Sequence, residues 1–444
     1  MNTSNKNISF IFQVHQPFRL KRYRFFDIGN DHYYFDDFQN EDIFRRIVEQ
    51  SYIPANRLML QLIKETKRRF RVAYAISGVA LEQIEMYAPE LIDSFTELAE
   101  TGCVEFLGET YAHSLASLAY DKDEFRIQVK EHAQKIELMF GQKPRVFRNS
   151  ELLYDDAIGK WVHDMGFDGV ITEGAKHILG WKSPNNLYKC ATTPELKLLL
   201  RNSHLTEDIS KNFTNYSWSE YPLTADKYAA WIAKDLQDGE VVNIDMSYDV
   251  LGSGNPADSG IFDFFRALPT YLEKEGIGFA TPSESIKNLT PKDALTIPDT
   301  ISWSEEEKNT NSWLGNTIQR EAFNKIQQLA ERTRLSQNRR LLQDWTYLQS
   351  SDHLYYMSSQ GDDVKLFSPY DNEYEAFNNY MNVISDFHLR VDEQYPSSIE
   401  NEELNALLIT IQNQGDEIAE LKKEIKQLEA EKGHSQKSST KEKK

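Results

Sequence analysis

Short runs of mainly apolar residues recur through the first two thirds of the chain, and longer stretches with helical spacing separate them. We expect strands in eight of these runs, at residues 8–14, 70–76, 103–107, 145–148, 169–172, 196–200, 241–246 and 277–280. A strand that helices cover on both faces is a continuous run of apolar residues, whereas a strand with one solvent-exposed face alternates apolar and polar residues. Because most of these runs do not alternate, the pattern predicts an α/β fold with a parallel sheet, either closed into a barrel or doubly wound.

One connecting segment shows the helical pattern clearly. Residues 124–140 carry large side chains at steps of three and four: Phe125, Val129, His132, Ile136 and Phe140. Gly141 follows, where a helix end favours a left-handed residue without a Cβ. We therefore expect a helix that ends at Phe140, with His132 packed in the core rather than acting as a ligand.

The pattern turns helical after about residue 303, with helical stretches expected at 313–345 and 374–389. Beyond Ser397, residues at alternating steps of three and four form a seam between Glu and Lys residues: Leu404, Leu407, Ile411, Gln414, Ile418, Leu421, Ile425 and Leu428. Such heptads favour a coiled coil that makes the protein an oligomer over a single surface helix. The predicted order is a barrel-type domain in 1–300, a helical domain in 301–396, a coiled coil in 397–432 and a disordered tail in 433–444.

Composition and charge narrow the class of partner. The chain has 444 residues, of which 40% are hydrophobic, so it can bury a large core. With 50 basic and 69 acidic residues the formal net charge is −19, which disfavours nucleic acid and anionic membranes as partners. No apolar run reaches the roughly 18 residues of a membrane span. Cys103 and Cys190 show no metal-binding spacing and no signal-peptide core is recognisable, so we expect a cytoplasmic protein with reduced thiols.

Polar residues follow four of the predicted strands. They are His15 to Pro17, Glu109 to His113, Asn149 to Glu151 and Ser247 to Asp249. The carboxyl ends of parallel strands meet at one edge, so these residues predict one shared site, although each alone also suits a packed histidine or a helix-capping acid. Carboxylates at two strand ends suit a retaining glycosidase, in which one attacks the anomeric carbon and the other protonates the leaving oxygen.

Several segments resemble glycoside hydrolase family 57, in particular its α-amylase-type members. They are residues 15–17 (HQP), 104–115 (VEFLGETYAHSL), 146–154 (VFRNSELLY), and 301–303 with 312–316 (ISW and SWLGN). By that match Glu151 is the nucleophile, and His15, His113 and Trp303 line the substrate cleft. The resemblance implies an incomplete seven-stranded (β/α) barrel followed by a helical region. It also implies action on α-1,4-glucans with retention, without a metal or other cofactor.

The sequence departs from the family at the position of the acid/base. The family typically reads MDYETFGEH there, whereas residues 246–254 read MSYDVLGSG, so Ser247 stands in place of the proton-donating Asp. Asn309 likewise replaces a family Asp. A hydroxyl is no substitute for a carboxylic acid, and the general-acid contribution is about 10²- to 10⁴-fold in rate. On a continuous strand Asp245 and Asp249 would face the same side as Ser247, which makes Asp249 a candidate substitute acid.

Two hypotheses therefore stay open. The first is an α-amylase-like hydrolase or glucanotransferase with impaired or altered activity, which the retained Glu151 favours. The second is a non-catalytic α-glucan-binding protein held in an oligomer by residues 404–428, which Ser247 favours. A polysaccharide deacetylase is disfavoured because no Asp-Asp-Gly first strand or His-x₃-His pair for a metal is present.

Overall fold

The computed structural model describes residues 6–336, 338–359 and 367–394, together with residue 414. Within these residues seven parallel strands form a ring: β1 (Asn7–Val14), β2 (Val72–Ile76), β3 (Val104–Phe106), β4 (Val146–Arg148), β5 (Gly169–Glu173), β7 (Lys197–Arg201) and β8 (Val241–Ser247). The eighth predicted strand is the short β11 (Gly278–Phe279), which pairs with the start of β1. The structure thus confirms the (β/α)₇ barrel and excludes the doubly wound alternative.

Two pairs of neighbouring strands in the ring share few backbone hydrogen bonds, and we call these two places seams. Between β7 and β8 the pairing is limited to Arg201 opposite Asn243. Between β3 and β4 it is the bridge of Gly108 to Phe147, with the Gly108 amide on the Val146 carbonyl and the Arg148 amide on the Gly108 carbonyl. The barrel is incomplete because its ring has seven strands, one fewer than a full (β/α)₈ barrel.

Both faces of the strands are buried, which is why they lack apolar alternation. On β1, Phe10 and Phe12 pack outward in a cluster with the surrounding helices, whereas Ile11 joins Ala73, Ala75, Ile171 and Leu199 inside the ring. The outer helices are α1 (Asp37–Ile47), α2 (Ile53–Glu65), α3 (Gly78–Tyr87), α4 (Glu90–Glu100), α5 (Asp123–Phe140), α6 (Asp156–Asp164), α7 (Lys176–Leu179), α8 (Ser203–Ser210), α9 (Ala225–Asp235), α10 (Ile261–Lys274) and α11 (Pro282–Asn288).

The helix expected at residues 124–140 is α5, and its end is the predicted one. Gly141 has φ 67°, in the left-handed region, and its amide bonds to the Glu137 carbonyl. His132 is fully buried and its ring nitrogens contact the Ile76 carbonyl and the Glu109 amide. The core role predicted for His132 is confirmed.

Four short strands have no counterpart in the sequence prediction. They are β6 (Tyr188–Cys190), β9 (Leu251–Gly252), β10 (Asn255–Pro256) and β12 (Ala294–Leu295). The strand β6 runs antiparallel to β7 and pairs with β12, outside the ring. Each has two or three residues, too few for a period to be visible in the sequence.

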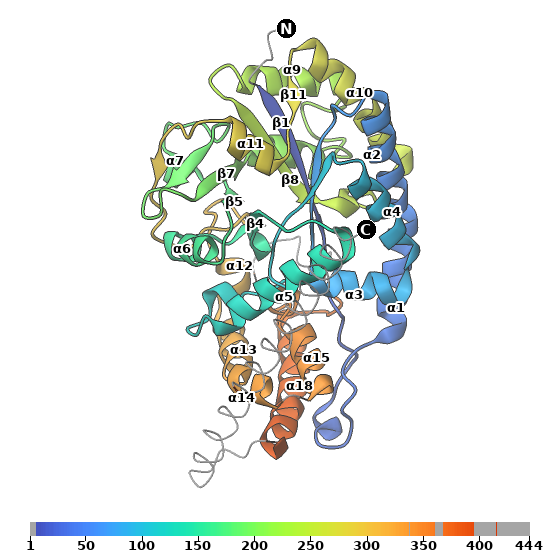
Figure 1. Cartoon of the computed structure of the whole chain (residues 1–444). Helices are drawn as coiled ribbons and strands as arrows, with labels where there is room; N and C mark the ends of the chain where they lie inside the picture. The colour runs from blue at the N-terminus through green and yellow to red at the C-terminus, as the bar shows by residue number, and fades with distance from the viewer. Residues whose placement is uncertain (1–5, 337, 360–366, 395–413, 415–444) are drawn as a thin grey trace, which may run out of the picture.

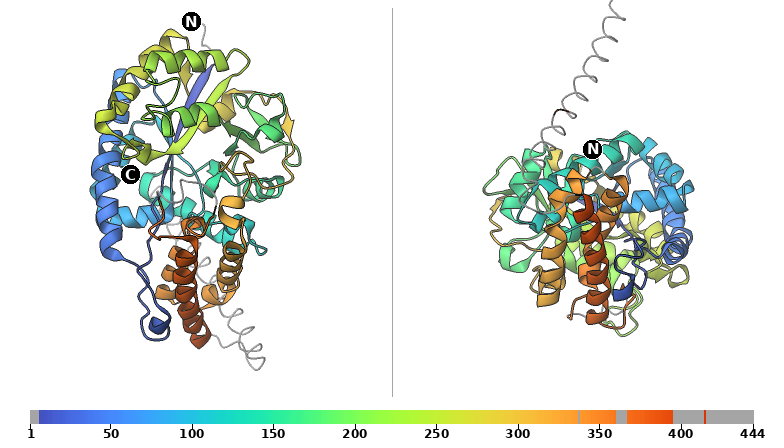
Figure 2. Two further views of the ribbon diagram at one scale, coloured as in Figure 1. Left: turned by 180° about the vertical axis from the view of Figure 1, so that it is seen from behind. Right: turned by 90° about the horizontal axis from the view of Figure 1, so that it is seen from below.

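The chain beyond the barrel is helical and lies at the carboxyl ends of the strands (Figures 1 and 2). The expected stretch 313–345 is divided into α12 (Asn311–Leu314), α13 (Thr317–Gln327), α14 (Ala330–Leu335) and α15 (Arg339–Leu348), followed by α16 (Ser351–Tyr355) and α18 (Glu373–Gln394). The coiled coil expected at residues 404–428 lies outside the described residues. None of the described helices is long and apolar enough to cross a bilayer.

The loop between β1 and α1 joins the barrel to the helical region. Phe18 stacks on Tyr347 with ring centroids 3.7 Å apart, and the Tyr34 hydroxyl donates to Asp386 in α18. Phe18, Tyr34 and Phe35 share one buried cluster with Trp345 and the inner face of α18. The helical region is therefore packed on the barrel through a common core.

The β3–β4 seam makes a testable prediction, because a Cβ at Gly108 would lie 2.5 Å from the Phe167 ring. Gly108→Ala should lower the free energy of unfolding by about 1–3 kcal/mol, the usual range for overpacking. Urea unfolding of Gly108→Ala, Phe167→Leu and the double variant measures this. The double variant should lose less than the sum of the single variants, and strict additivity would contradict the steric explanation.

Candidate active site

Glu151 lies directly after β4, in the turn Ser150–Leu152. Its φ of 56° is in the left-handed region, which non-glycine residues rarely adopt. The Asn149 side chain holds the turn, since its oxygen accepts from the Ser150 amide at 3.0 Å and its nitrogen donates to the Leu153 carbonyl at 2.9 Å. Unfavourable backbone conformations that surrounding contacts enforce are concentrated at functional sites.

The Glu151 carboxylate is held by side chains from three distant segments. His113 Nε2 lies 3.2 Å from Oε1, Ser351 Oγ donates to Oε1 at 2.7 Å, and Trp303 Nε1 donates to Oε2 at 2.7 Å. Burial would raise the pKa of Glu151, but His113 first, then Ser351 and Trp303, lower it below the usual value. The carboxylate is therefore ionised at neutral pH.

His113 bridges Glu151 to a second, fully buried carboxylate. Its Nδ1 lies 3.2 Å from Glu109 Oε2, and the side-chain nitrogen of Gln13 lies 3.0 Å from His113 Nδ1. Burial opposes a charge on the ring, but the hydrogen bonds to Glu109 and Glu151 prevail and raise the pKa of His113 to about 9. An imidazolium between two carboxylates results, and it keeps the pKa of Glu109 low despite burial.

His15 completes the cluster from the end of β1. Its ring stacks on His113 with centroids 4.1 Å apart, and its nitrogens contact Ser77 Oγ at 2.8 Å and Asp352 Oδ2 at 2.9 Å. Burial and the charge of His113 lower the pKa of His15. Burial opposes ionisation of Asp352, but the charge of His15 and their hydrogen bond hold its pKa well below the usual range.

Ser247 is the last residue of β8 and is exposed. It lies opposite Gln13 in the β1–β8 register, so the two side chains leave the same face of the sheet, and Gln13 contacts His113. Ser247, which the sequence predicts at the acid/base position, thus borders the Glu151 cluster.

The expected continuous strand through Asp249 is not observed. The strand β8 ends at Ser247 and a 3₁₀ turn, Tyr248–Val250, carries Asp249, so strand alternation does not set its direction. Burial raises the pKa of Asp249 above the usual value, while a hydrogen bond with Ser247 and the charge of His15 oppose this. Asp249 is thus a partly buried acid beside Ser247 and within the field of His15.

Asp245 is engaged elsewhere. Its two oxygens accept from Nε and Nη2 of Arg148, both at 2.9 Å, with side chains 2% and 3% exposed. Beside it Arg201 donates to the Asp245 carbonyl and to Glu173 Oε2, each at 2.9 Å. Breaking such a buried pair leaves an uncompensated charge, so Asp245 is a structural acid in the barrel interior.

The structure brings Glu151, His15, His113 and Trp303 together, with Ser247 and Asp249 at the same end of the barrel. Gln13, Ser351 and Asp352 also belong to this cluster and were not predicted, because no pattern distinguishes a polar residue in a short loop or inside a strand. The Asn309 side chain accepts from the Asn311 amide at 2.8 Å, within its own turn.

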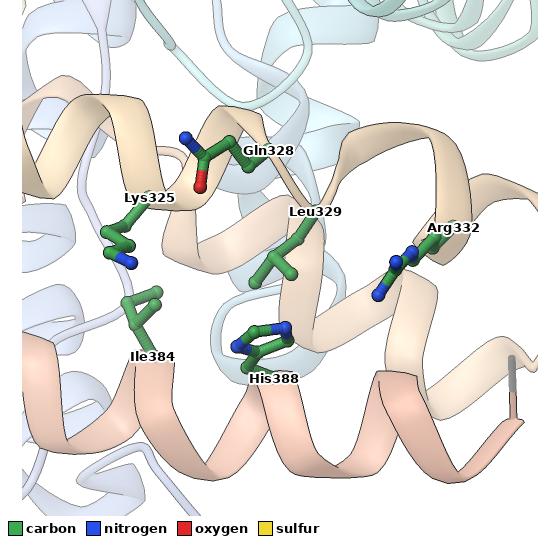
Figure 3. Close-up of a pocket in the computed structure, with 6 residues that line it drawn as sticks. All are labelled: Lys325, Gln328, Leu329, Arg332, Ile384 and His388. Atoms are coloured by element: carbon green, nitrogen blue, oxygen red, sulfur yellow. The ribbon is translucent and has the colours of Figure 1, made fainter. Parts of the chain in front are cut away.

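A separate groove lies within the helical region, between α18 and the segment that joins α13 to α14 (Figure 3). It is lined by Lys325, Gln328, Leu329, Arg332, Ile384 and His388. Arg332 and His388 both contact the Asp392 carboxylate. None of these side chains belongs to the cluster around Glu151.

In the described part of the chain, no group of three or more His, Cys, Asp or Glu side chains is arranged to hold a metal ion. The expectation that the reaction needs neither a metal nor another cofactor stays a prediction.

An ionised, firmly held carboxylate at the strand ends of a parallel barrel, with a second carboxyl group of raised pKa at the same end, is an arrangement that glycoside hydrolases use. The chain belongs to glycosyl hydrolase family 57, whose model matches residues 9–298. The family assignment made from the sequence is thereby confirmed.

A protein of Methanocaldococcus jannaschii, named "Putative alpha-amylase", is 38% identical in an alignment of 404 positions that covers 87% of this chain and 85% of that protein. The fold is similar to that of the branching enzyme of Thermococcus kodakaraensis, with a TM-score of 0.65 and 13% identity over 87% of this chain and 90% of that one. It is also similar to the 4-alpha-glucanotransferase of Thermococcus litoralis, with a TM-score of 0.58 and 15% identity over 86% of this chain and 60% of that one.

The raised pKa of His113 makes stability depend on pH. The stabilisation by the imidazolium is fully present below pH 6.5, the ordinary pKa, and is lost as pH rises through about 9. Across that range the unaltered protein should lose on the order of 3 kcal/mol of unfolding free energy relative to His113→Gln. Urea unfolding at several pH values measures the difference, and equal pH slopes for the two proteins would contradict it.

Proposed function

We propose that the chain acts on α-1,4-glucans as a retaining glycoside hydrolase or glucanotransferase, with Glu151 as nucleophile. We propose further that its activity is impaired or altered because Ser247 replaces the acid/base. The observation that carries the proposal is the Glu151 carboxylate, which three donors hold and whose pKa they lower. The names of the relatives, which include an amylase, a branching enzyme and a glucanotransferase, support the substrate class.

Asp249 is the candidate substitute acid. A nucleophile must be ionised and a general acid protonated at the same pH, and the surroundings move the pKa values of Glu151 and Asp249 in these opposite directions. Its position two residues beyond the family's acid calls for a different approach to the leaving oxygen. Poor placement of the acid is the physical reason for reduced hydrolysis of sugars with weak leaving groups.

His15, His113 and Trp303 are proposed to bind the sugar beside Glu151. The Trp303 ring is half-buried, and its indole nitrogen donates to Glu151. His113 contacts the same carboxylate, and His15 stacks on the His113 ring. An oligomer formed through residues 404–428 and a cytoplasmic location stay predictions from the sequence.

A non-catalytic α-glucan-binding protein is the second candidate. The exposed Ser247 hydroxyl at the acid's position favours it, because a binding protein needs the cleft but no proton donor. The two functions differ in one property, which is whether Glu151 reacts with a substrate that needs no acid.

Release of fluoride from α-maltosyl fluoride tests that property, since fluoride leaves without protonation. In the first turnover the unaltered protein and Asp249→Asn should release fluoride at similar rates, whereas Glu151→Ala should release none. Later turnovers also need a base to hydrolyse the glycosyl-enzyme. On soluble starch Asp249→Asn should be slower by about 10²-fold or more, and Ser247→Asp should be faster than the unaltered protein. Asp258→Asn, at an exposed position, controls for the loss of one negative charge.

The results separate the two candidates. If neither the unaltered protein nor Ser247→Asp releases fluoride, yet both bind maltooligosaccharide, the protein is a glucan-binding relative. If Asp249→Asn cleaves starch as fast as the unaltered protein, Asp249 is not the acid.

A further inference from the structure

The two oxygens of Glu151 are not equivalent. In the described part of the chain Oε1 has two partners, Ser351 Oγ at 2.7 Å and His113 Nε2 at 3.2 Å, whereas Oε2 has one, Trp303 Nε1 at 2.7 Å. A carboxylate oxygen has two lone-pair sites. Oε1 is therefore fully engaged, and Oε2 keeps one lone pair for a substrate.

We infer that Ser351 is a positioning residue, which together with His113 fixes Oε1 so that Oε2 is the atom that attacks the anomeric carbon. The inference rests on the proposed role of Glu151 and adds to it which oxygen reacts and what holds the other.

The main chain places the Ser351 hydroxyl. The Ser351 amide donates to the His113 carbonyl at 3.0 Å, and Ser350 forms an antiparallel bridge with Ser114. The next residue of this segment, Asp352, is hydrogen-bonded to His15. Ser351 thus reaches Glu151 from a segment that is hydrogen-bonded to the loop carrying His113, and this segment cannot shift without breaking these pairings.

Trp303 is placed in the same manner on the other side of the carboxylate. Ile301 and Tyr154 exchange backbone hydrogen bonds at 2.9 and 3.1 Å, and the Trp303 amide donates to the Glu151 carbonyl at 3.3 Å. The carboxylate therefore lies between two donors on separately fixed segments, which prevents its rotation about the last side-chain bond.

Burial makes the Ser351 contact effective. Ser351 is 0% exposed, so water does not compete for its hydroxyl, and a hydrogen bond to a charged group is stronger than one between neutral groups. Loss of this bond leaves Oε1 with the longer contact to His113 and frees the carboxylate to turn. A misdirected nucleophile lowers the rate of the chemical step while leaving substrate contacts in place.

With a glycosyl fluoride as substrate, the attack of Glu151 needs no other reactant. A lone pair of Glu151 Oε2 forms the bond to the anomeric carbon while the carbon–fluorine bond breaks, and fluoride leaves with that electron pair. No proton is transferred, so the step isolates the nucleophile from Ser247 and Asp249. Ser351 and His113 keep their bonds to Oε1 throughout.

The test compares the full-length protein with Ser351→Ala, Ser351→Thr and Ser312→Ala. Ser312 is a matched control, since it is a buried serine of the helical region whose hydroxyl pairs with Ser304 rather than Glu151. For fluoride release from α-maltosyl fluoride, Ser351→Ala should lower kcat about 10-fold or more with KM unchanged. The acid limb of its pH profile should rise by about one unit, because one donor to a charged group is lost.

A second measurement does not depend on turnover. In protein labelled with ¹⁵N at tryptophan, the Trp303 indole signal, assigned by its loss in Trp303→Phe, reports protonation of Glu151 through their hydrogen bond. Its titration midpoint should rise by about one pH unit in Ser351→Ala. Ser312→Ala should keep the midpoint of the unaltered protein, and Ser351→Thr, which retains the hydroxyl, should lie nearer to it than Ser351→Ala.

The outcomes distinguish the two claims. Absence of fluoride release from the unaltered protein overturns the proposed function and with it the attack by Oε2. If fluoride is released but Ser351→Ala changes neither the acid limb nor the indole midpoint, the role of Ser351 alone is overturned. A shift of equal size in Ser312→Ala would also overturn it, because the effect would then be general.

Discussion

The bridge that His113 makes between Glu109 and Glu151 is the interaction on which the site depends. Two carboxylates close together in a buried place repel each other, and the imidazolium between them makes both charges tolerable. Its ring in turn stacks on His15, which is anchored by Ser77 and Asp352. The ends of β1, β3 and β4 are thereby tied to one another by charge and hydrogen bonds rather than by strand pairing alone.

Buried charges in the barrel interior are likewise paired with opposite charges. Arg148 pairs with Asp245 and Arg201 with Glu173, and in both cases the partners come from different strands. A buried ion pair adds little net stability compared with well-packed apolar residues, but removal of one partner is costly. The Arg201–Glu173 pair joins the neighbouring strands β7 and β5, whereas the Arg148–Asp245 pair joins β4 and β8, which are not paired with each other.

The sequence predicted the parts of the structure that periodicity and composition encode. The strands of the ring and the helix α5 with its Gly141 end are where they were expected, because strands buried on both faces and a capped amphipathic helix leave clear patterns. Gln13 and Ser351 were not predicted, since contacts between residues 100 and 200 positions apart leave no local pattern. The position of Asp249 was missed for a different reason, as strand alternation was assumed beyond the point where β8 turns.

The donors to Glu151 also set the order in which the site can form during synthesis. Glu151 and Ser351 are 200 residues apart, and the cluster that packs the helical region on the barrel includes residues of α18. A ribosome that has released the whole barrel segment has therefore released a carboxylate without two of its three donors. The nascent chain completes the hydrogen bonds of the Glu151 carboxylate only when translation has passed α16, so this cluster is among the last features of the molecule to be assembled.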